Sequence, residues 1–260
     1  MKKFKDSYFV KTLELMKKNP KNVFLIILFD ILFLLSISIF YRLIEFLFSK
    51  TSTQISTIIV IIYLVLTLLY YLILILIYSF FKYLVLNSIK SLFEHSKVDF
   101  KRLKNFYLLN LLIFIVFFII FLFLNSIFLM SAKQEYASYI FSIINFPLFL
   151  ILYIFINISH TLFSENLNIK ETVKNTFNII AKVTSYIGIF LTNIIAIIIY
   201  FIIFYFIGLI LKATIFKGYL APIKYYNIYT IIFSIITTIF FYLIIFFNRI
   251  YFYNIIRNKK

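Results

Sequence analysis

Six long apolar stretches, separated by shorter polar segments, run along the 260-residue chain. Each holds more than about 18 residues with almost no charge, enough for a helix to cross a hydrocarbon layer of roughly 30 Å. None alternates apolar and polar residues as transmembrane strands do. The pattern predicts an all-α fold, a polytopic transmembrane helical bundle that forms one integral membrane domain over residues 1–260. Its six spans are expected at about 23–48, 55–86, 106–130, 137–163, 184–211 and 226–253.

The basic residues are distributed unevenly between the two sides that these spans define. The chain has 26 Lys and Arg against nine Asp and Glu, a net charge of +17. Twenty of the 26 lie in or beside both terminal segments and the segments 87–105 and 164–183, and six lie on the other side. Because cytoplasmic segments hold the excess of Lys and Arg, we expect a multi-pass protein of the cell membrane with both termini in the cytoplasm.

Three polar segments on this basic side, at about 6–19, 96–105 and 168–182, are predicted to form amphipathic interfacial helices. Apolar residues spaced three or four apart give each segment one apolar face, and lysines occupy the other. Such helices lie in the membrane interface with their lysines toward the lipid head groups, and anionic lipid is the expected contact. The candidate lipid-facing residues are Lys11, Lys17, Lys18, Lys101, Lys104, Lys170 and Lys174.

Capping residues support two of these helices. Asn168 precedes an apolar stripe of Ile169, Val173, Phe177 and Ile180, and Glu171 follows Asn168 by three residues, which is the spacing of a capping box. Ser96 and Asp99 form a similar pair ahead of the second segment. Both pairs predict that a helix begins directly after them.

The basic segments recur along the chain. Thr12, Glu94 and Thr176 mark equivalent positions 82 residues apart, and two spans follow each of them. This period favours three copies of a unit made of one interfacial helix and one transmembrane hairpin. The alternative is a chance similarity between lysine-rich segments, because few side chains are identical between the copies.

The segment 12–24, Thr-Leu-Glu-Leu-Met-Lys-Lys-Asn-Pro-Lys-Asn-Val-Phe, and its echo at 176–182 resemble lead-in helices of six-helix prokaryotic integral membrane families of unassigned function. These include the membrane domain associated with glycerophosphodiester phosphodiesterases. The resemblance covers the organisation of most of the chain and implies a six-helix membrane domain. Lead-ins of those families usually carry Trp, which is absent here, and the resemblance supplies no catalytic residue.

Ionisable residues inside the spans form the candidate intramembrane polar site. Asp30 lies in the first span, and Lys82 and Arg249 lie near the inner ends of the second and sixth. Such groups usually face the bundle interior and have a partner there. A structural ion pair of Asp30 with Lys82 or Arg249 is the first interpretation, and a proton or cation site is the alternative.

Amides and a histidine are the other polar groups of the spans. Hydrogen bonds between helices are predicted for Asn110, Asn125, Asn145, Asn157 and Asn193, and a polar path is the alternative. His160 is interpreted as an ordinary interfacial histidine, because no second histidine lies near it in the sequence.

Catalytic and metal-binding motifs are absent from the sequence. It has no Cys, no HExxH, no GxSxG and no Gly-rich phosphate loop, and His95 and His160 are its only imidazoles. We therefore expect a non-enzymatic protein without cofactor, metal or nucleic-acid partner. The leading hypothesis is a membrane scaffold or envelope homeostasis factor that contacts anionic lipid, a partner protein or a second copy of itself as a homo-oligomer. The alternative is a small transporter or permease subunit that uses Asp30 with Lys82 or Arg249.

Overall fold

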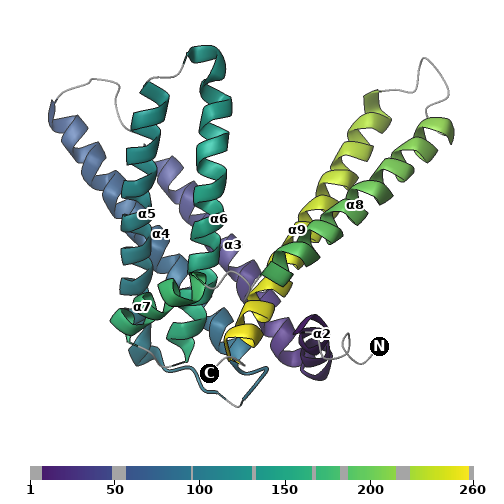
Figure 1. Cartoon of the computed structure of the whole chain (residues 1–260). Helices are drawn as coiled ribbons and strands as arrows, with labels where there is room; N and C mark the ends of the chain where they lie inside the picture. Colours follow the sequence, from purple (N-terminus) through teal and green to yellow (C-terminus); the bar gives the residue numbers. More distant parts are fainter. Residues whose placement is uncertain are drawn as a thin grey trace. The chain divides into compact units, whose positions relative to one another are not determined.

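A computed structural model describes residues 8–48, 57–94, 96–130, 133–165, 168–181, 187–214 and 223–257. These residues form eight α-helices and two short 3₁₀ helices, and they contain no strand (Figure 1). The α-helices are α2 (Tyr8–Lys18), α3 (Pro20–Phe48), α4 (Thr57–Lys90), α5 (Leu103–Met130), α6 (Ala137–Ser164), α7 (Ile169–Ile180), α8 (Ile187–Thr214) and α9 (Ile223–Arg257). The 3₁₀ helices are η1 (Phe100–Arg102) and η2 (Gln134–Tyr136).

Six helices are long and apolar enough to cross a membrane, which confirms the predicted class of multi-pass α-helical membrane protein. Large apolar side chains are exposed along them, for example Phe24 at 63%, Leu64 at 66% and Ile143 at 71%. Exposed apolar surface on this scale has the acyl chains of a bilayer as its natural solvent. The spans are Pro20–Phe46, Ile61–Lys90, Phe100–Phe128, Ala137–Ser164, Gly188–Ile210 and Thr230–Arg257.

Several helices extend further than the apolar pattern predicts. α3 begins at Pro20, three residues before the predicted start, since proline is well suited to the first position of a helix, where no hydrogen-bonded N–H is needed. α4 continues to Lys90 and α9 to Arg257, each four residues beyond the predicted end. Both extensions include polar residues, and a hydropathy pattern does not show whether a helix continues through such residues.

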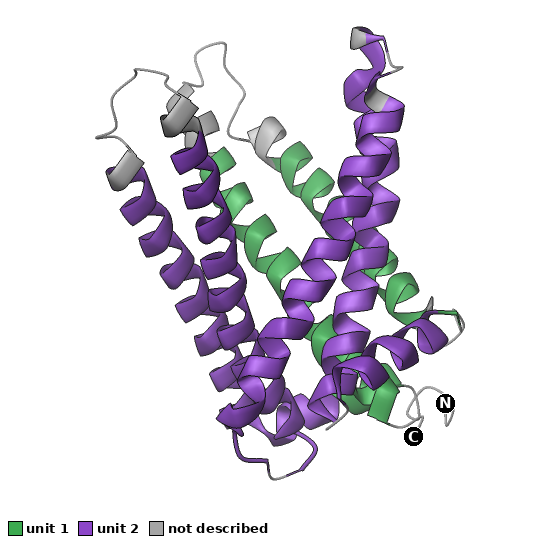
Figure 2. Ribbon diagram, turned by 90° about the vertical axis from the view of Figure 1, so that its left-hand side faces the viewer, with its two compact units in different colours: residues 1–12, 181–260 green, residues 13–180 purple. Residues whose placement is uncertain are grey.

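The chain divides into two compact units (Figure 2). Unit 1 comprises Met1–Thr12 and Ala181–Lys260, and unit 2 comprises Leu13–Ile180. In unit 2, α3 packs against α4, α4 against α5 and α5 against α6, while α7 packs on α6 and α5. Successive spans run antiparallel, so α3 and α5 begin at the end of unit 2 where α4 and α6 terminate. We call this end of unit 2 the lysine-rich end.

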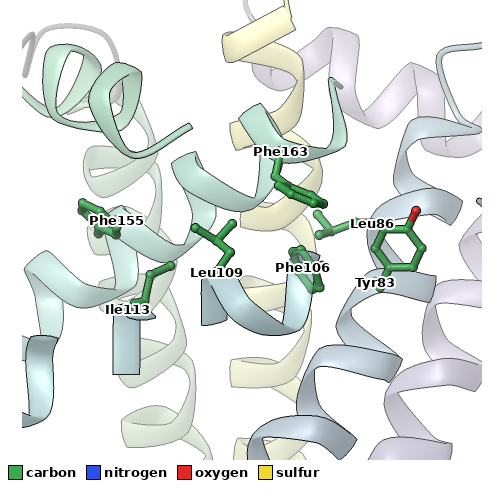
Figure 3. Packing of buried hydrophobic residues seen from close by; sticks show 7 residues of the cluster. All are labelled: Tyr83, Leu86, Phe106, Leu109, Ile113, Phe155 and Phe163. Carbon is green, nitrogen blue, oxygen red and sulfur yellow. The ribbon is translucent and has the colours of Figure 1, made fainter. Parts of the chain in front are cut away.

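A hydrophobic core cluster joins α4, α5 and α6 in unit 2 (Figure 3). Aromatic rings contact one another there: the centroids of Phe106 and Phe163 are 5.3 Å apart, and those of Phe106 and Tyr83 are 5.5 Å apart. Three apolar residues of α7 pack against this cluster, so α7 is held to the bundle by its apolar face. The cluster comprises Tyr83, Leu86, Phe106, Leu109, Ile113, Phe155 and Phe163.

α7 has the predicted cap but a partly different buried face. The backbone N–H of Glu171 donates to Asn168 Oδ1 at 2.8 Å, as the capping pattern predicts. Phe177, predicted on the apolar face, is 61% exposed, although its ring lies 5.2 Å from that of Phe155. Thr172 and Thr176 are fully buried instead. Burial of Thr176 is tolerated because its hydroxyl donates to the Thr172 carbonyl one turn earlier, at 2.7 Å.

The second predicted interfacial segment, 96–105, forms an extended stretch, the 3₁₀ helix η1 and the first residues of α5 in place of a separate helix. Asp99 caps η1, since its Oδ1 accepts from the backbone N–H of Lys101 at 3.0 Å. Ser96 takes no part in that cap, and its hydroxyl lies 2.8 Å from that of Ser91. Asp99 is therefore the helix-starting residue of this segment.

Unit 1 joins the first residues of α2 to the last turns of α9. Asn254 Nδ2 donates to Thr12 Oγ1 at 3.1 Å, and the rings of Phe9 and Phe247 are 5.1 Å apart. Thr12 is fully buried, although its apolar neighbour Leu13 is 44% exposed. Contacts between the two ends of the chain thus hold this part of α2 in place.

Part of the element order recurs along the chain, and the predicted repeat of three units stays a prediction. A short helix followed by a hairpin occurs as α2–α3–α4 and again as α7–α8–α9. The described part of α9 ends at Arg257, 167 residues after α4 ends at Lys90, whereas two of the predicted periods of 82 residues make 164. The middle hairpin, α5–α6, is preceded by η1 instead of a short α-helix.

Candidate functional site

A chain of hydrogen bonds crosses three spans of unit 2. His160 of α6 is fully buried, and its Nε2 lies 2.6 Å from Asn110 Oδ1 on α5. Asn110 Nδ2 donates to Ser79 Oγ on α4 at 3.0 Å, and the Ser79 hydroxyl donates to the Ile75 carbonyl at 2.6 Å. We call Ser79, Asn110 and His160 the polar triad.

The hydrogen bonds of the triad are consistent with one assignment of donors and acceptors. The single hydroxyl proton of Ser79 is used on the Ile75 carbonyl, so Ser79 must accept from the Asn110 amide. Asn110 then presents its carbonyl oxygen to His160, and the histidine must carry a proton on Nε2 to donate. The network thereby selects one imidazole tautomer.

The structure places His160 inside the bundle, four residues before the end of α6, and its predicted depth at the membrane interface stays a prediction. The ring is enclosed by aromatic side chains, with Phe106 at 4.8 Å and Tyr78 at 6.2 Å between centroids. Its Nδ1 is buried without a hydrogen-bond partner. The described residues contain no group of three His, Cys, Asp or Glu side chains that could hold a metal ion. His95, the other imidazole, lies outside the described residues.

A second amide pair joins α5 to α6. Asn125 Nδ2 donates to Asn145 Oδ1 at 3.0 Å, and Asn145 Nδ2 donates to Asn125 Oδ1 at 2.9 Å. Both side chains are buried, and each also donates to a carbonyl one turn back on its own helix. The prediction that amides of the spans bond between helices is confirmed for Asn110, Asn125 and Asn145. Asn157 differs, because its Nδ2 donates to Tyr153 O within α6.

An apolar cavity of about 490 Å³ lies among α3, α4, α5 and α6. Asn110 of the polar triad contributes the one amide of its wall. Aliphatic and aromatic side chains form the rest, so the space suits hydrocarbon. The lining residues are Ile37, Tyr71, Leu74, Ile75, Tyr78, Asn110, Ile113, Phe114, Phe117, Phe118, Phe121, Leu148, Phe149, Leu152 and Ile156.

Two cations at the lysine-rich end stabilise the C-terminus of α6. Arg102 donates through a guanidinium nitrogen to the Phe163 carbonyl at 2.9 Å and lies 4.6 Å above the centre of the Phe163 ring. Lys90 Nζ donates to the Ser164 carbonyl at 3.1 Å and forms an ion pair with Glu94 at 3.3 Å. The last carbonyls of a helix lack partners and carry partial negative charge, so both contacts are favourable. These two cations are structural.

The seven candidate lipid-facing lysines are all exposed. Lys17 and Lys18 end α2, Lys101 and Lys104 lie at η1 and the start of α5, and Lys170 and Lys174 lie on α7. These six belong to the lysine-rich end of unit 2, and Lys11 belongs to unit 1. The lysines are therefore free to meet an anionic surface, unlike Lys90 and Arg102.

Asp30 and Lys82 lie farther from their helix ends than from the predicted ends of their spans. Asp30 follows the start of α3 by ten residues, about 15 Å along the helix, and Lys82 precedes the end of α4 by eight residues, about 12 Å. Both side chains are partly buried, and their helices are neighbours in unit 2. Arg249 is partly buried in α9 of unit 1. The predicted ion pair of Asp30 with Lys82 or Arg249 stays a prediction.

A repeated motif that the sequence interpretation missed becomes visible when the helix ends are aligned. α4 ends in Lys82-x4-Asn87-x2-Lys90 and α9 in Arg249-x4-Asn254-x2-Arg257, with the same offset of 167 residues. α6 carries the related Asn157-x2-His160. An asparagine followed three residues later by a lysine, arginine or histidine thus recurs in the second helix of each hairpin.

Comparisons with protein families, with curated proteins and with solved structures find no match to this chain.

Proposed function

We propose that this protein is a non-enzymatic multi-pass protein of the cell membrane whose lysine-rich end contacts anionic lipid head groups on the cytoplasmic side. The proposal rests on the observation that some basic side chains at this end are exposed while others are bonded to the protein. Lys17, Lys18, Lys101, Lys104, Lys170 and Lys174 are exposed, whereas Lys90 and Arg102 bond to the end of α6. A cluster of exposed lysines beside transmembrane helices is attracted to the negatively charged inner leaflet.

The packing of α7 supports this role. Because α7 is fixed to the bundle through Ile169 and Val173, Lys170 and Lys174 on its exposed side are held in place relative to the spans. A fixed charged surface binds head groups without the entropy loss of ordering a loose segment. The same surface also suits an acidic partner protein, which is the competing reading of the charge.

Lipid preference of the purified full chain tests the proposal. We expect lipid copurifying with the wild type to be enriched in phosphatidylglycerol over phosphatidylcholine when both are supplied equally and retained lipid is measured by native mass spectrometry. The combined variant Lys101→Gln, Lys104→Gln, Lys170→Gln and Lys174→Gln should lose most of this enrichment. Lys133→Gln, an exposed position between α5 and α6 at the opposite end, is the matched control. Equal retention of both lipids by the wild type would overturn the proposal.

The second candidate function is a small transporter or permease subunit that couples through Asp30 with Lys82 or Arg249. Its support is that Asp30 and Lys82 are both partly buried on neighbouring helices at similar depths. Asp30→Asn separates this role from a structural one. Loss of proton flux in proteoliposomes with unchanged expression and melting temperature would favour transport, whereas loss of folded protein would favour a structural ion pair.

A further inference from the structure

The apolar cavity of unit 2 has the size of a ligand site. Its volume of about 490 Å³ compares with roughly 300 to 1,000 Å³ for pockets that hold small ligands. Protein interiors are close-packed and contain few voids larger than a water molecule. A space of this size between packed transmembrane helices is therefore expected to be filled.

The cavity opens toward the hydrocarbon layer. Four of its aromatic lining residues, Tyr71, Phe114, Phe118 and Phe149, are 47, 40, 48 and 53% exposed. All four belong to membrane spans, where an exposed side chain contacts lipid acyl chains. The space is thus continuous with the acyl-chain layer.

The wall offers little to a polar solute. The one amide, that of Asn110, already accepts from His160 and donates to Ser79. Apart from the two tyrosine hydroxyls of Tyr71 and Tyr78, the remaining lining is hydrocarbon. A polar molecule would lose its hydration here without gaining equivalent hydrogen bonds, whereas an acyl chain has no polar group to satisfy.

The length of the cavity matches a lipid tail. Along α5 the lining runs from Asn110 to Phe121, eleven helical steps, or about 16 Å at the rise of an α-helix. One leaflet contributes half of a hydrocarbon layer of roughly 30 Å. We propose that the cavity is a specific binding site for one acyl chain of a membrane phospholipid. This site goes beyond the proposed head-group contact and does not depend on the lysines.

A single introduced tryptophan can test the site, because the chain contains no Trp. Phe117→Trp places the reporter in the cavity wall, and Ile119→Trp places it on the same helix at a residue that is 59% exposed and outside the lining. Each full-length variant, purified in detergent, is titrated with phosphatidylcholine brominated in its acyl chains, which quenches nearby tryptophan. We expect saturable quenching at low lipid fraction for Phe117→Trp and gradual, unsaturated quenching for Ile119→Trp.

A second substitution in the Phe117→Trp background fills the cavity. Leu152→Phe should raise the lipid fraction at half-saturation by roughly tenfold or more, because an added ring and an acyl chain would overpack the same space. Ile37→Phe serves the same purpose if Leu152→Phe lowers the yield of folded protein. The proposal is overturned if the two reporters show the same unsaturated quenching, or if a folded filler variant leaves half-saturation unchanged. Brominated phosphatidylglycerol should reach half-saturation at the same lipid fraction as brominated phosphatidylcholine. The lysine-to-glutamine variant should not change that lipid fraction. Failure of the acyl-chain site can therefore be told apart from failure of the head-group contact.

Discussion

Asn110 and His160 lie on adjacent membrane spans and are joined by a hydrogen bond of 2.6 Å between Asn110 Oδ1 and His160 Nε2. Both side chains are buried, at 5 and 0% exposure. Because Ser79 takes the other end of the Asn110 amide, one residue links α4, α5 and α6. We interpret the polar triad as a hydrogen-bond network that stabilises the packing of these three helices around the apolar cavity.

Asn110→Leu should destabilise the protein by about 1 to 3 kcal/mol, because it removes the hydrogen-bond partner of His160 Nε2 in a fully buried position. The double variant Asn110→Leu with His160→Phe should recover part of this loss, since replacing both partners with apolar groups leaves no unpaired donor. Unfolding free energy in mixed micelles, followed by circular dichroism, measures both effects. Ser36→Ala is the control, because that exposed hydroxyl bonds only to Leu32 O of its own helix. An unchanged stability of Asn110→Leu would contradict the stabilising role of the polar triad.

The reciprocal bonds of Asn125 and Asn145 predict energetic coupling across α5 and α6. A double-mutant cycle with leucine at both positions should give a coupling of about 1 kcal/mol, within the range found for hydrogen bonds between membrane helices. Asn125 paired with Asn157 is the matched cycle, because Asn157 bonds within its own helix. Equal coupling in both cycles would show that the Asn125–Asn145 contact is not specific.

The spans could be predicted from the sequence because hydropathy and helix length are local properties. The cap of α7 was equally accessible, since Asn168 and Glu171 lie three residues apart on one continuous helix start. The contact of Asn110 with His160 was not, because these residues are 50 positions apart and no local pattern sets the rotation of one span against another. Polarity alone pointed to both residues, but it did not pair them.

The buried face of α7 is a second feature that the sequence pattern did not predict correctly. Hydrophobicity favours burial of Phe177 over Thr172 and Thr176, yet both threonines are fully buried and Phe177 is exposed. A threonine hydroxyl on a helix can bond to a carbonyl of its own preceding turn, as Thr176 does, which removes much of the cost of burying it. The periodic pattern therefore gave the helix but not its rotation.

Arg102 predicts a strict requirement for a guanidinium. Arg102→Ala should cost about 1 to 2 kcal/mol of unfolding free energy, because it removes the bond to the Phe163 carbonyl and the contact with the Phe163 ring. Arg102→Lys should recover only part of this, since an ammonium cannot stack in the same way on the ring. The adjacent exposed residue provides the control, and Lys101→Ala should leave the melting temperature nearly unchanged. Full rescue by lysine would mean that charge alone accounts for the effect.

In unit 1, the effect of replacing Gly188 by alanine should depend on the hydroxyl of Tyr251. A Cβ at Gly188 would lie 3.3 Å from Tyr251 Oη, tighter than most packed contacts, so the tyrosine would have to shift slightly. In the Tyr251→Phe background this oxygen is gone, so Gly188→Ala should stabilise the protein by up to about 1 kcal/mol through its higher helix propensity. In the wild type the gain should be smaller or absent. Thermal unfolding of the four variants measures the difference, and an equal gain in both backgrounds would contradict the close contact.

Six spans with the lysine-rich end in the cytoplasm form the central claim, and the accessibility of single cysteines tests it most directly. The chain has no Cys, so each introduced thiol reports one position. We predict that a membrane-impermeant thiol reagent added to intact cells labels Lys133→Cys, whereas Lys11→Cys, Lys101→Cys and Lys170→Cys are labelled only after the membrane is permeabilised. Labelling of Lys101→Cys or Lys170→Cys in intact cells, or equal access to Lys11→Cys and Lys133→Cys from the same side, would contradict the account.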